Sequence, residues 1–152
     1  MKRIIKIIIT FFLVALVFLY VFLISSNKLT VEPLLRDSTN ISLLFVEHKG
    51  LSTPISSFNT VSKKADIDAI TNIFQKYRLY RRINQQDSFY QHESNVKSVT
   101  VSFFEGKELK IKFTVYDDGV LIINEKYYGC GYLGSNNVTN IYNELLQYKA
   151  ES

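Results

Sequence analysis

Apolar and polar residues alternate with a period of two through much of the second half of the chain. Residues 109–116 place Leu, Ile, Phe and Val on one face and Lys, Lys, Thr and Tyr on the other, and residues 96–104 alternate in the same way. This pattern is typical of antiparallel strands with one buried and one wet face. The predicted strands are residues 41–48, 55–61, 96–104, 109–116, 120–124 and a short one at 126–128.

Two segments instead repeat their apolar residues every three or four positions, which predicts amphipathic helices. The first extends from Lys63 to about Arg82, with Ser62 as its expected N-cap. The second extends from about Val138 to Lys149, with Asn137 as its expected N-cap.

The order of these elements predicts an α+β fold: a single antiparallel sheet of four to six strands with two helices on one face. The folded domain is expected over residues 40–152. Residues 25–39, which hold one proline and mixed charge without a sustained period, are expected to form a juxtamembrane linker.

Residues 7–24 are entirely uncharged and contain no glycine or proline. As a helix, this stretch would extend about 27 Å, close to the roughly 30 Å hydrocarbon core of a bilayer. It therefore predicts one N-terminal transmembrane helix that acts as a signal anchor. Lys2, Arg3 and Lys6 precede it, so residues 1–6 are expected to form a cytoplasmic tail and residues 40–152 an extracytoplasmic domain.

A cleaved secretory signal is the alternative interpretation of the same stretch. The apolar core of such a signal is usually 7–15 residues and ends in a small-x-small cleavage site. The run here is longer, and Ile24-Ser25-Ser26 does not fit that pattern. No cysteine stands near residue 25, which excludes a lipoprotein anchor.

Composition narrows the possible functions. An apolar fraction of 47% is too high for a disordered chain, and a single cysteine excludes an intramolecular disulfide. Three of the 18 basic residues precede the apolar stretch, so the rest of the chain carries 15 against all 14 acidic residues. A domain so close to neutral gives no reason to expect a nucleic-acid partner.

No motif predicts a catalytic, cofactor or metal site. Residues 129–134 match G-x-G-x-x-G, but only 18 residues follow, which leaves no room for the second strand of a dinucleotide-binding unit. Nothing in the spacing brings His48 or His92 to Cys130, and the two histidines are far apart. Residues 117–119 (Asp-Asp-Gly) indicate a hairpin turn.

A basic cluster is the first candidate site. Lys76, Arg78, Arg81 and Arg82 follow one another closely at the end of the first predicted helix, where guanidinium groups can pair with anionic lipid or protein groups. The alternative is a solvated helix end whose positive charges suit the helix dipole.

The wet face of residues 109–116 is the second candidate, as a protein interface. It combines basic and aromatic side chains, a pairing common in protein interfaces: Lys110, Lys112, Thr114 and Tyr116. The alternative is an ordinary exposed strand.

The layout resembles small membrane-anchored extracytoplasmic proteins of low-GC Gram-positive bacteria. The resemblance lies in the Lys2–Lys6 start (KRIIK), one apolar span, a short linker and a compact domain rich in Ile, Lys, Asn and Tyr. Some of those proteins are uncharacterised and others are immunity proteins that neutralise a secreted toxin. A domain with an adequate core and no catalytic constellation favours a non-enzymatic, membrane-tethered module that binds a protein or an anionic envelope component outside the bilayer. A small accessory subunit acting through its transmembrane helix and an envelope enzyme are the alternatives.

Overall fold

The computed structural model describes residues 2–26, 28–49, 53–81, 95–130 and 137–149. The helices are α1 (Lys2–Ser26), α2 (Glu32–Leu35), α3 (Lys64–Lys76), α4 (Val138–Leu145) and a final 3-10 turn, η1 (Leu146–Tyr148). The strands are β1 (Lys28–Leu29), β2 (Asn40–Glu47), β3 (Ile55–Val61), β4 (Leu79–Arg81), β5 (Lys97–Glu105), β6 (Glu108–Tyr116), β7 (Leu121–Ile123) and β8 (Lys126–Cys130).

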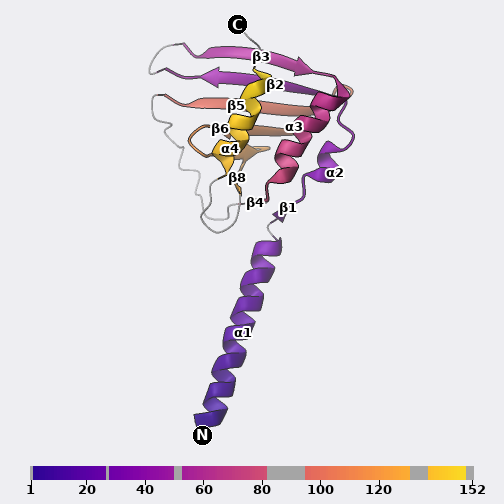
Figure 1. Cartoon of the computed structure of the whole chain (residues 1–152). Helices are drawn as coiled ribbons and strands as arrows, with labels where there is room; N and C mark the ends of the chain where they lie inside the picture. The colour runs from indigo at the N-terminus through magenta and orange to yellow at the C-terminus, as the bar shows by residue number, and fades with distance from the viewer. Residues whose placement is uncertain (1, 27, 50–52, 82–94, 131–136, 150–152) are drawn as a thin grey trace.

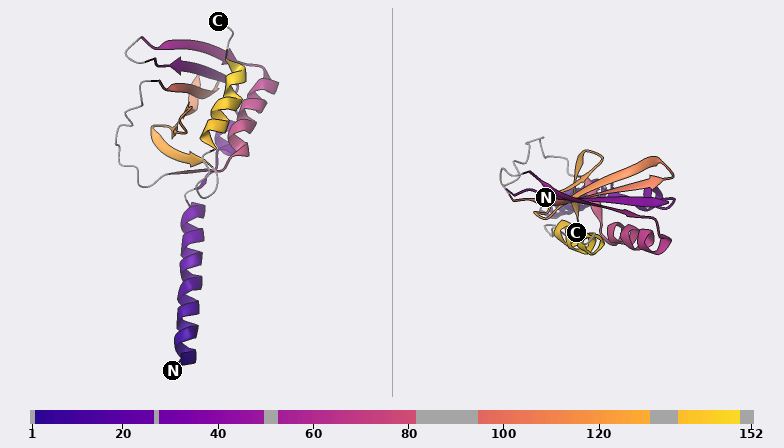
Figure 2. Two further views of the ribbon diagram at one scale, coloured as in Figure 1. Left: turned by 60° about the vertical axis from the view of Figure 1, so that its left-hand side comes forward. Right: turned by 90° about the horizontal axis from the view of Figure 1, so that it is seen from above.

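The described strands form one antiparallel sheet in the order β1-β4-β8-β7-β6-β5-β2-β3 (Figure 1). Helices α3 and α4 lie side by side on one face of it (Figure 2). The α+β class and the single antiparallel sheet are confirmed. The expected strand number was wrong, because the sheet has eight strands instead of four to six, the two additional strands being β1 and β4.

The predicted helix over residues 63–82 is shorter than expected. It ends at Lys76, and the chain re-enters the sheet as β4, where Leu79 is buried opposite Cys130. Strand β4 connects β1 to β8, so sheet pairing overrides the helical period that the basic and aromatic residues suggest. Lys63, not Ser62, occupies the N-cap position.

The segment after α1 is also more ordered than a linker. Strand β1 pairs with β4, and α2 follows it directly. Val31 and Leu35 are 5% and 1% exposed and belong to the main core. These two aliphatic side chains explain why residues 28–35 fold onto the domain, since burying a side chain of that size contributes about 1.5–3 kcal/mol.

Aromatic packing joins the helices to the sheet. Phe74 of α3 lies over Phe113, with ring centroids 4.2 Å apart, and meets the edge of Phe103 at 5.8 Å. Phe103 and Phe113 themselves pack edge to face on the adjacent strands β5 and β6. All three side chains are fully buried, so the centre of the core is an aromatic triangle.

A β-bulge changes one face assignment. Phe103 pairs with Ile111, but its neighbour Phe104 pairs with Leu109, so Lys110 is the extra residue of β6. The bulge turns Leu109 away from the core, and its side chain is 50% exposed. Strict alternation predicted that Leu109 shares the buried face of Ile111, and this prediction was wrong.

Helix α1 is the one described element whose apolar residues do not join the core. It precedes the edge strand β1 and projects from that end of the sheet (Figure 1). Side chains in α1 are described for Lys6 and residues 8–20. Within the residues described in this way, no helical stretch reaches the length and hydropathy of a membrane span.

The aromatic triangle makes a stability prediction. Phe74→Ala leaves a cavity among Phe103, Phe113 and their neighbours and should lower the free energy of unfolding by about 3–5 kcal/mol. Phe58→Ala is a matched control, because Phe58 is 61% exposed on β3 and its loss should cost less than about 1 kcal/mol. Urea unfolding followed by circular dichroism measures both. Equal losses would show that the triangle does not carry the core.

Candidate functional site

The structure separates the predicted basic cluster. Lys76 ends α3, Arg78 is half-buried before β4, and Arg81 is exposed at the end of β4, on the same face of that strand as the buried Leu79. Arg82 lies outside the described residues. The change from helix to strand after residue 76 replaces a period of 3.6 with one of 2, so the side chains do not share one helical face.

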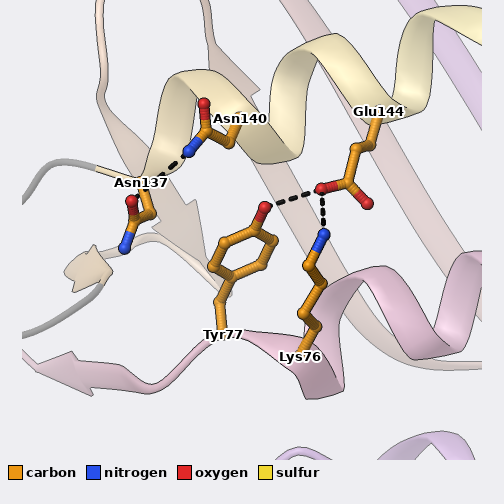
Figure 3. Close-up of polar contacts among 5 residues, drawn as sticks. All are labelled: Lys76, Tyr77, Asn137, Asn140 and Glu144. Carbon is orange, nitrogen blue, oxygen red and sulfur yellow. Dashed lines mark hydrogen bonds and ion pairs between the residues drawn. The ribbon is translucent and has the colours of Figure 1, made fainter.

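Lys76 takes part in a polar contact between the two main helices (Figure 3). Its Nζ lies 2.8 Å from Oε1 of Glu144 on α4, and the Tyr77 hydroxyl donates to the same oxygen at 2.6 Å. At the start of α4, the Asn140 amide donates a hydrogen bond to Oδ1 of Asn137 at 3.3 Å. Asn137 occupies the N-cap position of α4, as the sequence predicts. The Lys76 charge therefore has an intramolecular partner, which supports the helix-end interpretation over an anion site.

The same contacts change the ionisation of Glu144. Hydrogen bonds from Lys76 and Tyr77 lower the pKa of Glu144 below its ordinary value. The hydrogen bond to Glu144 likewise raises the pKa of Lys76. Burial and the neighbouring carboxylate raise the pKa of Tyr77, so near neutral pH the phenol stays protonated and can donate.

The sheet face opposite α3 and α4 is the second candidate, and here the strand register brings residues together. One row of cross-strand neighbours extends over six strands, from β3 to β8: Phe58, Leu44, Thr100, Thr114, Ile122 and Tyr127. Lys112 and Tyr116 lie two residues to either side of Thr114 on the same face. We call this surface the open face and define it by these eight residues.

The open face is more apolar than the wet side of a single strand suggests. Phe58 is 61% and Leu44 37% exposed, while Ile122 and Tyr127 are half-buried. The hydroxyls of Thr100 and Thr114 lie 3.2 Å apart and satisfy each other in the middle of the row. The surface thus places apolar side chains on either side of a polar threonine pair, and protein-binding surfaces mix apolar and polar groups in this way.

The predicted interface residues divide between this surface and the bulge. Lys112, Thr114 and Tyr116 lie on the open face, as the alternation of β6 predicts. Lys110 is the bulge residue, and its Nζ pairs with Glu105 at 2.6 Å and Glu108 at 3.7 Å. It belongs to the charged end of the β5–β6 hairpin and not to the row.

The two described residues of the glycine motif, Gly129 and Cys130, and the Asp-Asp-Gly turn have structural roles. A Cβ at Gly129 would overlap the Tyr80 ring, which lies across it from β4. Cys130 is 1% exposed, and burial raises the pKa of its thiol to about 12, so near neutral pH it is protonated and packed in the core. Asp118 Oδ1 accepts from the N–H of Val120 in the β6–β7 turn, where Gly119 has a φ of 93°. Residues 131–136 and His92 lie outside the described residues.

Two shallow hollows lie beside β3, on the side of the helices. One of about 90 Å³ lies between Ile55–Ser57 and Tyr142, Leu146 and neighbouring residues. The other, of about 360 Å³, is lined largely by polar side chains of residues 59–63, Asp66 and residues 147–149. Both are open to solvent, unlike the enclosed, largely apolar cavities that usually hold a small molecule.

Among the described residues, no group of three or more His, Cys, Asp or Glu side chains is placed to hold a metal ion. Comparison of the chain with protein-family models, with curated proteins and with solved structures finds no match. The geometry of the described surface is therefore the basis for any functional proposal.

The Glu144 contact predicts a pH-dependent contribution to stability. Because its pKa is lower in the folded chain than in the unfolded chain, the carboxylate stabilises the fold fully above about pH 5 and loses this effect as the pH falls through its folded pKa. Glu144→Gln should cost up to about 1 kcal/mol at pH 7, and the difference from the unmodified protein should shrink between pH 5 and 3.

Urea unfolding at several pH values measures this difference. Glu125→Gln, in the exposed β7–β8 turn, is the matched control and should show a smaller effect. A Glu144→Gln difference that stays constant down to pH 3 would contradict the ionic origin of the contact.

Proposed function

We propose that this protein is a non-enzymatic binding module, held at the cell membrane by α1, whose extracytoplasmic α+β domain binds a protein partner through the open face. An immunity or inhibitor protein acting on a secreted toxin is one activity of this kind. The observation that carries the proposal is the open face itself: an eight-residue surface with exposed Phe58 and Leu44 at one end and Lys112 and Tyr116 beside its centre.

Apolar area that stays exposed to water carries a free-energy cost. Each square ångström of apolar surface moved out of water contributes about 25 cal/mol. A sheet that needed no partner on its second face would carry polar side chains in the row that Leu44, Phe58 and Ile122 occupy. A partner that covers this row gains apolar contact with Leu44, Phe58 and Ile122 on either side of the threonine pair, and hydrogen bonds from the lysine beside it.

Membrane attachment is supported by the surface of α1. The helix is 25 residues long, and between Ile8 and Tyr20 its large apolar side chains are 46% to 77% exposed. They surround the helix instead of forming one stripe, so packing against a single protein surface would leave part of them in water. A lipid environment contacts all of them. The basic residues Lys2, Arg3 and Lys6 then favour a cytoplasmic N-terminus.

This anchoring predicts the behaviour of the intact protein on fractionation. It should stay with the membranes in alkaline carbonate and be released by detergent, and a tag after Ser152 should be cleaved by protease added to whole cells. Leu13→Lys with Val17→Lys should move it to the soluble fraction, since each charge at the centre of a span costs about 2.5–3.5 kcal/mol. Leu13→Ile with Val17→Leu is the matched control. Recovery of the unmodified chain in a high-speed supernatant without detergent would refute the anchor.

The open face predicts a directional cross-linking pattern in membranes of cells that make the protein. A photo-cross-linking amino acid at Lys112 should give one discrete protein adduct, whereas the same group at Gln75, exposed on α3, should give none. Adding Leu44→Lys should reduce the Lys112 adduct about tenfold, which corresponds to about 1.4 kcal/mol of binding free energy.

Two outcomes would contradict the proposal. Equal adducts from Lys112 and Gln75 would show that the open face has no special role. Adducts formed only from Phe11 or Phe18 in α1 would instead favour an accessory subunit that acts through its membrane helix. Charge reversal at Arg78 and Arg81 should leave the Lys112 adduct unchanged, because those residues do not belong to the open face.

A further inference from the structure

The two edges of the sheet differ in a way that the open face does not explain. One edge is β1, which is only two residues long and directly follows α1. The other is β3, seven residues long, which pairs along its whole length with β2 and, among the described residues, with no strand on its other side. The backbone N–H and C=O groups on that side are available for pairing.

Strand β3 lacks the features that usually prevent edge-to-edge pairing. Soluble proteins protect long edges with lysine, proline, bulges or inward-pointing charges. Residues 55–61 (ISSFNTV) contain no charge and no proline, and their register with β2 is regular throughout. The nearest proline and lysine, Pro54 and Lys63, stand outside the strand.

Side chains on both faces of β3 complete a surface along this edge. On the open face, Phe58 is 61% exposed. On the helix side, both hollows extend along the strand, the smaller at residues 55–57 and the larger from Asn59 to Lys63. The Ser57 hydroxyl borders the smaller hollow and is buried without a hydrogen-bond partner among the described residues.

We propose that the exposed edge of β3 accepts an extended, uncharged segment of another protein as a ninth strand of the sheet. Backbone hydrogen bonds along β3 give this association its affinity. Alternate side chains of the added strand would lie beside Phe58 and over the two hollows, which select a small side chain near Ser57 and a polar one near Asn59. The inference deepens the proposed binding function by naming the conformation and chemistry of the bound segment.

The position of the anchor decides between a different protein and a second copy of this chain. Helix α1 leads into the β1 edge, and β3 is the opposite edge (Figure 1). Seven strand spacings of about 4.8 Å separate the two edges by about 34 Å along the sheet. Two copies paired β3 to β3 would extend in opposite directions, with their α1 helices at the two far ends. Helices in one membrane cannot satisfy that arrangement, so a partner without this anchor is the occupant; this step rests on the membrane attachment proposed above.

Residue-level hydrogen exchange of the full chain in lipid nanodiscs tests the edge. The probe is a blocked peptide with the sequence of residues 55–61, which pairs with β3 free of any anchor. Every second amide of β3, those that face away from β2, should exchange fast in the chain alone and at least about tenfold more slowly at saturating peptide. A peptide with prolines at alternate positions should have no effect.

Adjacent proline variants provide a matched pair within the protein. In an antiparallel strand the N–H groups of neighbouring residues point to opposite sides. Of the variants Ser56→Pro and Ser57→Pro, one therefore removes a hydrogen bond to β2, and the other removes a donor on the exposed edge. The variant that keeps its melting temperature is the edge variant, and it should lose peptide protection. If this variant still binds the peptide as the unmodified chain does, strand addition is refuted.

The remaining outcomes are distinguishable. The proposal is overturned if the peptide does not slow exchange of the outward amides of β3. It is also overturned if those amides are already protected in the isolated chain at every concentration. Protection that rises with the concentration of the chain would identify a second copy as the occupant and overturn the choice of partner. If the peptide protects the outward amides but Lys112 and Gln75 give equal adducts, strand addition at β3 is retained and binding through the open face is rejected.

Discussion

The contact between Phe74 and the pair Phe103 and Phe113 fixes which face of the sheet is dry. Phe74 joins α3 to two neighbouring central strands, and α4 packs beside α3 over the same strands. Because the aromatic triangle is fully buried, every other strand must point its apolar set to the same side. The opposite face is left to solvent or to a partner, and the functional proposal depends on this one-sided arrangement.

Much of the fold follows from local pattern. Strands β2, β3, β5 and β6 alternate or carry enough β-branched and aromatic residues to be recognised, and their predicted bounds differ from the observed ones by one residue or less. Strand β1 could not be recognised because two residues hold no measurable period, and β4 was missed because its residues continue the helical spacing of α3. They exist through pairing with distant strands, and the buried contact of Leu79 with the β8 end of the sheet stabilises them.

The candidate site was only partly accessible to sequence reasoning, for a related reason. Alternation along β6 places Lys112, Thr114 and Tyr116 on one surface, but it says nothing about the neighbouring strands. Leu44 and Ile122 reach the same surface through register, and register depends on pairing across the sheet. One local signal was present: strand β7 is apolar on both faces, and the outer face of β2 carries Leu44 and Val46 beside two polar residues.

The junction after α1 determines how the domain would respond to mechanical load. A pull between α1 and the domain reaches β1 first, and β1 is held to β4 by two residue pairs, Lys28 with Tyr80 and Leu29 with Leu79. The next residues along the chain to resist the pull are Val31 and Leu35, whose side chains are buried in the core. Tension would therefore peel away β1 and extract α2 before the long central strands carry force. Under load, residues 28–35 would unfold first and extend, while the strands that form the open face stay folded.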